Sequence, residues 1–233
     1  MNSRLANLKT RSSALLAEAY LRLGAALVFG LIVAVGCLFF FAWLADEMLE
    51  GATRAFDETV RAEVHSFAAP AVTIVMQWAS FLGSTAFLVG LGVVLLIVFW
   101  LLKRKRAALL FAITMICSTL LLVTLKTNFA RTRPEPFFDF AAPASYSFPS
   151  GHALSALCFY GTLSAIVCAR LKNPVAQALI WVGAAFLIIL IGLSRIYLGV
   201  HYPSDVIAGY AAALVLVFAV AAGDRLFLRP RQI

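Results

Sequence analysis

The chain has 233 residues, of which 63% are hydrophobic and only 13% are charged. Soluble domains carry about 25% charged residues, so this composition excludes an ordinary soluble protein and indicates an integral membrane protein. The net charge of +8 is divided among short basic runs between apolar segments. That distribution is typical of membrane topology, and no basic, aromatic-studded face of the kind that binds nucleic acid is visible. The four cysteines lie in apolar segments without a CxxC pair, so neither a metal site nor a disulfide framework is predicted.

Apolar segments long enough to cross a bilayer recur along the chain, since a span needs about 20 mostly apolar residues. They predict an all-α, polytopic membrane protein with six transmembrane helices, in a single domain that fills residues 1–233. The predicted spans are residues 23–45, 82–102, 107–125, 152–170, 176–194 and 204–222. The shorter apolar stretch 70–81 predicts a helix that lies at the membrane interface or leads into the second span. The first segment is too long for a signal peptide and is expected to be retained.

The basic residues predict the orientation of these spans. Thirteen of the 19 Lys and Arg residues, including the run "KRKR" at 103–106, fall on one side of the predicted membrane. The positive-inside rule places that side, and with it both termini, in the cytoplasm. We therefore predict a multi-pass protein of the cell (inner) membrane whose other side faces the periplasm or exterior. On that outer side, loop 46–69 predicts a solvated amphipathic helix, and its His65 is interpreted as a surface or packing residue.

Ionisable residues gather in short stretches that cap the predicted spans on the outer face. The stretches are "KTNFARTRP" (126–134), "PSGH" (149–152) and "SRIYLGVHYPSD" (194–205). Lys126, Arg133 and Arg195 place cations beside hydrocarbon, where ionisable groups are costly and indicate function. Few acidic residues are near enough to neutralise them, and arginine forks suit phosphate oxygens. An anion is therefore the expected partner.

The other two motifs add groups that act on such an anion. Ser150 stands where it can cap a helix, Gly151 permits close backbone approach, and a helix N-terminus offers free amides to anions. Pro203 predicts the first residue of the last span, which allows Asp205 to reach back to His201. A carboxylate on one imidazole nitrogen fixes the tautomer and frees the other nitrogen as a nucleophile. His201 is then predicted to attack phosphorus, and His152 to protonate the leaving oxygen.

Together the motifs match the pattern K-x6-R-P, P-S-G-H and S-R-x5-H-x3-D. This resembles the type 2 phosphatidic acid phosphatase family of integral membrane lipid phosphatases, which shares its site with soluble vanadium-dependent haloperoxidases. The resemblance implies that Lys126, Arg133 and Arg195, with Ser150 and the Gly151 amide, hold the phosphoryl oxygens. It implies a phosphohistidine on His201 and a reaction that needs no metal or other cofactor. Ser194 is interpreted as a supporting residue only.

The resemblance implies a lipid phosphate as substrate and membrane lipids as surroundings, with no nucleic acid and no inferable protein partner. An isoprenoid diphosphate and a glycerophospholipid phosphate both remain open. Aromatic residues between the first two motifs are expected to line the mouth of the site or to pack the loop, namely Phe137, Phe138, Phe140 and Tyr146. The alternatives are a lipid transporter or scramblase that uses the same anion site, a vanadate-dependent oxidase, and an inactive binding protein.

Overall fold

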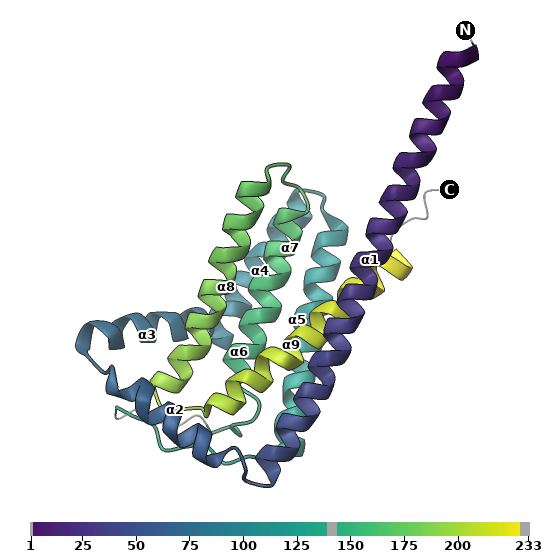
Figure 1. The fold of residues 1–233 in the computed structure, drawn as a ribbon. Helices are drawn as coiled ribbons and strands as arrows, with labels where there is room; N and C mark the ends of the chain where they lie inside the picture. Colours follow the sequence, from purple (N-terminus) through teal and green to yellow (C-terminus); the bar gives the residue numbers. More distant parts are fainter. Residues whose placement is uncertain (1, 139–143, 229–233) are drawn as a thin grey trace.

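The computed structural model of this protein describes residues 2–138 and 144–228. All regular elements within those ranges are helical, which confirms the all-α prediction (Figure 1). In chain order they are α1 (Asn2–Leu49), α2 (Arg54–Ser66), α3 (Pro70–Leu82), α4 (Thr85–Leu101), α5 (Lys105–Phe129), α6 (Gly151–Ala156), the π-helical turn η1 (Leu157–Gly161), α7 (Thr162–Cys168), α8 (Pro174–Tyr197), α9 (Pro203–Gly223) and the π-helical turn η2 (Asp224–Leu228).

Within the described residues, 5 helical segments are long and apolar enough to cross a membrane. They are Leu27–Leu49, Lys105–Phe129, Gly151–Cys168, Pro174–Tyr197 and Pro203–Leu226. A sixth crossing is obtained if α3 and α4, which meet at an angle of 50°, form one broken span. Ser84 restarts the chain after the break, because its Oγ accepts a hydrogen bond from the Phe87 amide at 3.3 Å and caps α4. The stretch predicted to lie at the interface or to lead into the second span is therefore the separate helix α3, which extends sideways from the bundle (Figure 1).

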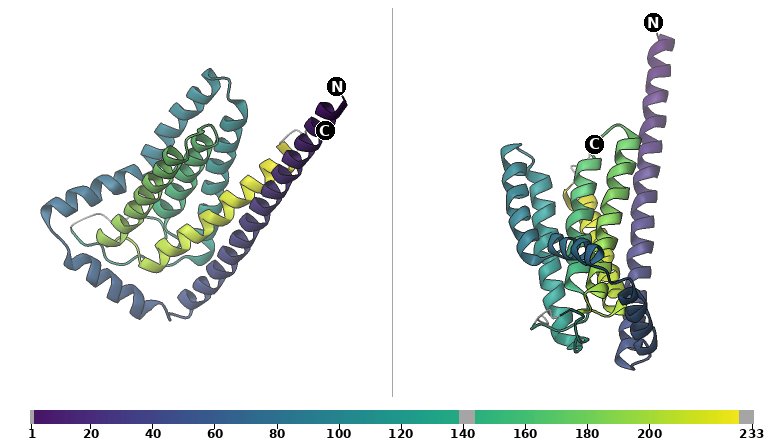
Figure 2. Two further views of the ribbon diagram at one scale, coloured as in Figure 1. Left: turned by 45° about the horizontal axis from the view of Figure 1, so that its top comes forward. Right: turned by 90° about the vertical axis from the view of Figure 1, so that its left-hand side faces the viewer.

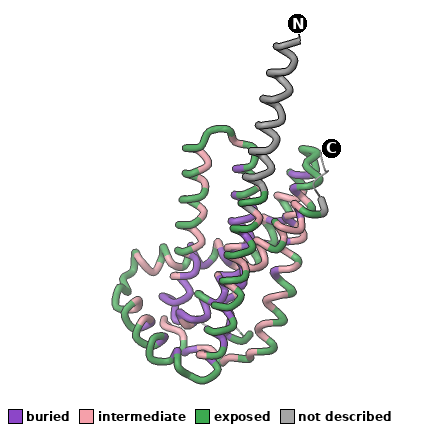
Figure 3. The backbone as a smooth tube through the Cα atoms, turned by 45° about the vertical axis from the view of Figure 1, so that its right-hand side comes forward, coloured by how far each residue is buried: buried purple, intermediate pink, exposed green. Residues whose placement is uncertain are grey.

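The outer helices present apolar side chains outward, as a bilayer requires. Phe29 on α1 and Leu179 on α8 are 66% and 68% exposed, and many large hydrophobic residues of α4 and α5 are similarly exposed. Water-soluble monomers rarely carry such continuous apolar faces. Buried residues instead gather inside the lower half of the bundle in Figure 3. The interior contacts are thus concentrated at one end.

Helix α9 is central to the packing of the bundle. It runs beside α1 (Figure 2) and also contacts α5 and α6. A Cβ atom on Gly209 would stand only 2.8 Å from the carbonyl oxygen of Ser150, so glycine allows the start of α6 to press against α9. The Ser150 amide completes this contact by donating to the Asp205 carbonyl oxygen at 2.9 Å. The "PSGH" turn and the start of α9 are therefore fixed to each other.

The helix expected in loop 46–69 exists as α2, but the prediction of a solvated helix is wrong for one of its faces. Asp57 is completely buried and Arg61 is 7% exposed, because this face lies against α8 and α9. His65 is a packing residue: its ring stacks on Phe137 with centroids 3.9 Å apart. Phe138 stacks on Tyr197, which favours the loop-packing interpretation, while Phe140 lies outside the described residues.

Candidate active site

The three motifs meet at one end of the bundle. Lys126 lies in the last turn of α5, and Arg195 lies in the last turn of α8. Gly151 begins α6, and Asp205 lies in the first turn of α9. Because α5 and α8 end where α6 and α9 begin, residues far apart in the sequence come into one electrostatic environment. His152 accordingly interacts electrostatically with Arg195, His201, Arg133 and Lys126.

His201 and Asp205 form the most buried pair of this site, with exposed fractions of 2% and 0%. The Nδ1 atom of His201 lies 3.2 Å from Oδ2 of Asp205. The same oxygen accepts a hydrogen bond from the Tyr202 amide at 2.9 Å, because Pro203 starts the helix and brings Asp205 under the preceding turn. The hydroxyl of Ser147 donates to Oδ2 as well. The carboxylate is thus fixed on three sides, and it orients the imidazole.

Arg133 determines which nitrogen of His201 carries the proton. Its Nη1 atom lies 3.0 Å from Nε2 of His201, and a guanidinium can only donate. Nε2 must therefore be the acceptor, and Nδ1–H donates to Asp205. Burial lowers the pKa of His201 to about 4; Asp205 opposes this shift, and the charge of Arg133 adds to it. At neutral pH the ring is uncharged, with its Nε2 lone pair facing the cations.

The cations are held chiefly by neutral oxygen atoms. Lys126 donates to the carbonyl oxygens of Tyr146 and Ser147. Arg133 donates to the Val200 carbonyl at 2.7 Å and to Ser145 through its carbonyl and hydroxyl oxygens. Burial lowers the pKa of Arg133 while the charge of Asp205 raises it.

Arg195 reaches across to α3, where its Nη1 donates to the hydroxyl of Ser80. Its Nε atom is buried and has no hydrogen-bond partner among the described residues. Buried donors are nearly always satisfied, so this N–H group is available to a bound anion. The neighbouring Ser194 hydroxyl instead donates to the Ile191 carbonyl of its own helix at 2.6 Å.

The "PSGH" turn differs in one respect from the expectation. Ser150 occupies the N-cap position of α6, but its side chain makes no capping hydrogen bond. Its Oγ is buried and has no partner among the described residues, and the first-turn amides that follow it have no intrahelical acceptor. A free hydroxyl, free amides and the imidazole of His152 therefore occupy consecutive positions on the chain.

A second layer of contacts centres on Arg131, which the sequence analysis did not select. Its Nη1 donates to Oδ1 of Asp205 at 2.7 Å, and its Nη2 donates to Oδ2 of Asp57 at 2.8 Å. Asp57 also accepts from the Ser204 amide at 2.9 Å and the Ser204 hydroxyl at 2.7 Å. Burial lowers the pKa of Arg131, but the charge of Asp205 and its bonds to both carboxylates raise it overall. Helix α2 is thereby tied to the carboxylate that orients His201.

A signal for this layer existed in the sequence. Asp57 and Arg61 are four residues apart and so share one face of a helix. Asp57 and Arg131 are 74 positions apart, so the sequence did not show that Arg131 is the residue that Asp57 binds. Among the described residues, no group of three or more His, Cys, Asp or Glu side chains is placed to hold a metal ion.

Comparison with known proteins gives the family. The PAP2 superfamily matches residues 107–226, which include all three motifs. The chain belongs to this superfamily. It is an integral membrane phosphatase, because PAP2 membership coincides here with several membrane spans.

Individual PAP2 relatives extend the match to most of the chain. "Phosphatidylglycerophosphatase B" of Bacillus subtilis (strain 168) is 30% identical over 199 residues, which are 85% of this chain and 98% of the relative. "Undecaprenyl-diphosphatase" of Sulfolobus acidocaldarius is 33% identical over 117 residues, which are 46% of this chain and 51% of the relative. The crystal structure of a transmembrane PAP2-type phosphatidylglycerolphosphate phosphatase from Bacillus subtilis superposes with a TM-score of 0.78 at 28% identity, covering 86% and 98% of the two chains. The helical membrane fold is therefore shared along nearly the whole of that relative.

Proposed function

We propose that this chain hydrolyses a lipid phosphate or diphosphate at the outer face of the cell membrane, through a phosphohistidine on His201. The observation that carries the proposal is the geometry of that residue. A buried, uncharged imidazole has Nδ1 bound to Asp205 and Nε2 directed at Arg133. Such an arrangement suits an in-line attack on phosphorus, since Nε2 carries no proton and faces the Arg133 guanidinium, which also attracts the phosphoryl oxygens.

The proposed reaction proceeds in two steps. Lys126, Arg133 and Arg195 bind the phosphoryl oxygens, together with the Ser150 hydroxyl and the Gly151 amide. Nε2 of His201 then bonds to phosphorus while the bond to the leaving oxygen breaks, and His152 gives that oxygen a proton. In the second step, His152 takes a proton from water, the hydroxide oxygen bonds to phosphorus, and the bond to Nε2 breaks. The products are inorganic phosphate and the lipid with one phosphoryl group fewer.

A lipid substrate is favoured by the position of the site. The proposed phosphate ligands lie at the ends of helices whose outer faces are apolar, so a head group can reach them while its tails remain in the bilayer. Among lipids we favour a glycerophospholipid phosphate, because the relative that matches nearly end to end is a phosphatidylglycerophosphatase. An isoprenoid diphosphate is the second candidate, supported by a relative matched over a shorter region.

The proposed location is the inner membrane, with the site facing the periplasm or exterior. Its support is the excess of basic residues at the opposite ends of the spans, where the run 103–106 covers the α4–α5 connection and the start of α5.

The test is phosphate release by the purified full-length protein in detergent, with a chelator present. The panel contains phosphatidylglycerol phosphate, phosphatidate, undecaprenyl diphosphate and glucose 6-phosphate, and His201→Ala serves as the inactive control. We expect release from a lipid well above release from glucose 6-phosphate. Equal rates on the sugar phosphate, or a requirement for added metal, would contradict the proposal.

A further inference from the structure

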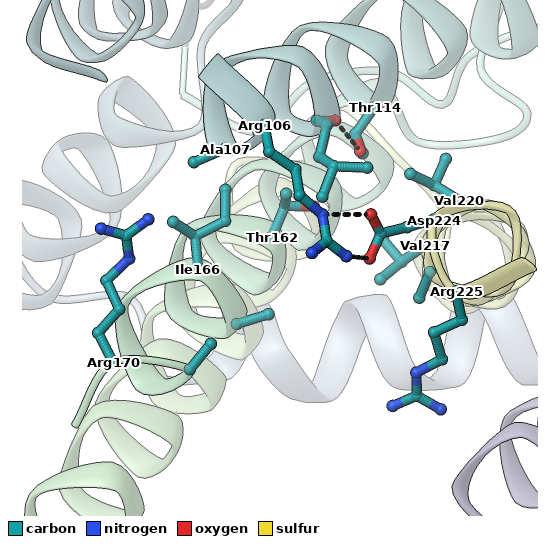
Figure 4. A pocket seen from close by; sticks show the side chains of 14 residues that line it. Arg106, Ala107, Thr114, Thr162, Ile166, Arg170, Val217, Val220, Asp224 and Arg225 are labelled. Carbon is teal, nitrogen blue, oxygen red and sulfur yellow. Dashed lines mark hydrogen bonds and ion pairs between the residues drawn. The ribbon is translucent and has the colours of Figure 1, made fainter. Parts of the chain in front are cut away.

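A cavity of about 360 Å³ lies at the end of the bundle opposite His201, between α5, α7 and α9. Its walls are mostly apolar and include Leu110, Ile166 and Val217. Three arginines and one carboxylate stand around it, and Figure 4 shows them from close by. None of its lining residues belongs to the three motifs, so it is separate from the proposed phosphatase site.

The carboxylate, Asp224, forms an ion pair with one of the three arginines. Arg106 binds Asp224 with two parallel contacts, from Nε to Oδ1 at 2.8 Å and from Nη2 to Oδ2 at 2.5 Å. This bidentate pair joins the first turn of α5 to the start of η2, directly after α9. The hydroxyl of Thr114, deeper inside, is also satisfied, because it donates to the Leu110 carbonyl of its own helix at 2.8 Å.

Two positive charges remain at the rim. Within the described part of the chain, Arg170 and Arg225 have no carboxylate within ion-pair distance. Figure 4 shows their guanidinium groups on either side of the Arg106–Asp224 pair and directed away from it. A site with two uncompensated cations at the end of membrane spans, above apolar walls, matches a molecule with an anionic head and a hydrocarbon chain.

We propose that this cavity binds one anionic phospholipid from the leaflet opposite the phosphatase site. Its phosphate lies at the rim, where the charges of Arg170 and Arg225 attract it, and an acyl chain lies along the walls formed by α5, α7 and α9. A zwitterionic lipid would leave the two rim charges in excess, and a small soluble anion would leave the apolar walls unfilled. Arg170 lies just beyond the span Gly151–Cys168, and Arg225 lies at the far end of the span Pro203–Leu226. The lipid therefore joins the far ends of two helices that carry the site.

The test measures lipid binding to the full-length protein by native mass spectrometry and by thermal unfolding in neutral detergent. Phosphatidylglycerol is compared with phosphatidylcholine of the same acyl chains. The variant is Arg170→Gln/Arg225→Gln. The matched control, Lys103→Gln/Arg104→Gln, removes two charges from the loop at the same end, which does not line the cavity.

We expect one retained phosphatidylglycerol per wild-type chain and stabilisation by that lipid alone. Each rim charge near a lipid surface contributes roughly a factor of five in binding, so the rim variant should bind about 30-fold more weakly. The control should change less than about twofold. Equal weakening in both variants would mean general attraction to basic loops, and equal binding of the two lipids would also overturn the proposal.

A second measurement covers the case in which the rim variant fails to fold. A photoactivatable phosphatidylglycerol is cross-linked to the wild-type protein, and the modified peptides are sequenced. Cross-links on α5, α7 and α9 around Ile166 and Val217 are expected. Cross-links confined to the end that carries His201 would place the bound lipid in the phosphatase site and contradict the inference.

Discussion

Asp57 offers the sharpest test of how α2 contributes to the catalytic end of the molecule. It touches none of the groups proposed to bind phosphate. It holds Arg131, which in turn holds Asp205. We expect Asp57→Asn to lower kcat by about 100-fold and to leave KM close to that of the wild type, because the change acts on the orientation of His201.

The magnitude follows from the burial of these charges. Both carboxylates are completely buried, and the side chain of Arg131 is 14% exposed. Opposite charges about 4 Å apart attract by about 4 kcal/mol at the effective dielectric of such sites. Loss of one partner from a buried pair costs about 3–5 kcal/mol, and Arg131 retains Asp205, so we expect a loss near 3 kcal/mol in the free energy of unfolding. A displacement of about 1 Å at the reacting atoms costs roughly 100-fold in rate.

The assay separates positioning from mere stability. Steady-state kcat and KM are measured below the melting temperature of the variant, together with the rate of phosphohistidine formation in a single turnover. Glu58→Gln is the control on the same helix, since Glu58 is 51% exposed and pairs only with Arg61 among the described residues. It should stay within about twofold of the wild type. A destabilised Asp57→Asn protein that kept the wild-type kcat would refute the positioning role.

The remaining predictions concern the nucleophile, the cations and the topology. His201→Ala should abolish phosphate release in a folded protein, and retained turnover would remove the nucleophile assignment. Because burial lowers the pKa of His201 to about 4, kcat/KM should persist above that pH and fall as the pH drops through it; an acid limb near 6.5 would contradict this. Ser145→Asp should pair with Arg133 and weaken competitive inhibition by vanadate at least tenfold, whereas the neutral Ser145→Asn should not. An impermeant thiol reagent applied to intact cells should label Ser66→Cys but not Lys172→Cys, both at exposed positions, and the reverse pattern would invert the proposed orientation.

The helical membrane fold was predictable because its determinants are local. Runs of about 20 apolar residues mark the spans directly, and Pro203 and Asp205 mark the start of α9 through contacts within one turn. The predicted approach of Asp205 to His201 is a four-residue relation and is present at 3.2 Å. The break between α3 and α4 was only partly visible, because a bend leaves the apolar composition of the two segments unchanged.

The supporting contacts were not predictable because they join distant positions. The partner of Arg195 is Ser80, which is 115 positions away on α3. The hydroxyl of Ser147 reaches Asp205 across 58 positions. Serine is common in loops and caps, so nothing in the sequence separates these residues from ordinary turn residues. The partners of Ser80 and Ser147 become clear only from the structure, in which α3 packs against α8 and the loop before α6 packs against the start of α9.

The cations at this end of the bundle differ in the oxygen atoms that they bind, and this difference determines which of them can attract an anion. Lys126 and Arg133 are held by carbonyl oxygens, and within the described residues neither lies within ion-pair distance of a carboxylate. A carbonyl dipole stabilises a cation without cancelling its net charge, so these groups keep their attraction for phosphate. Arg131, in contrast, binds the carboxylates of Asp57 and Asp205, and these two negative charges neutralise its positive charge. The choice of oxygen acceptor therefore divides the cations into those that remain available to the substrate and one that supports the nucleophile. Placing a carboxylate at Ser145 would neutralise Arg133 and make it less available to the substrate while every motif residue stayed in place.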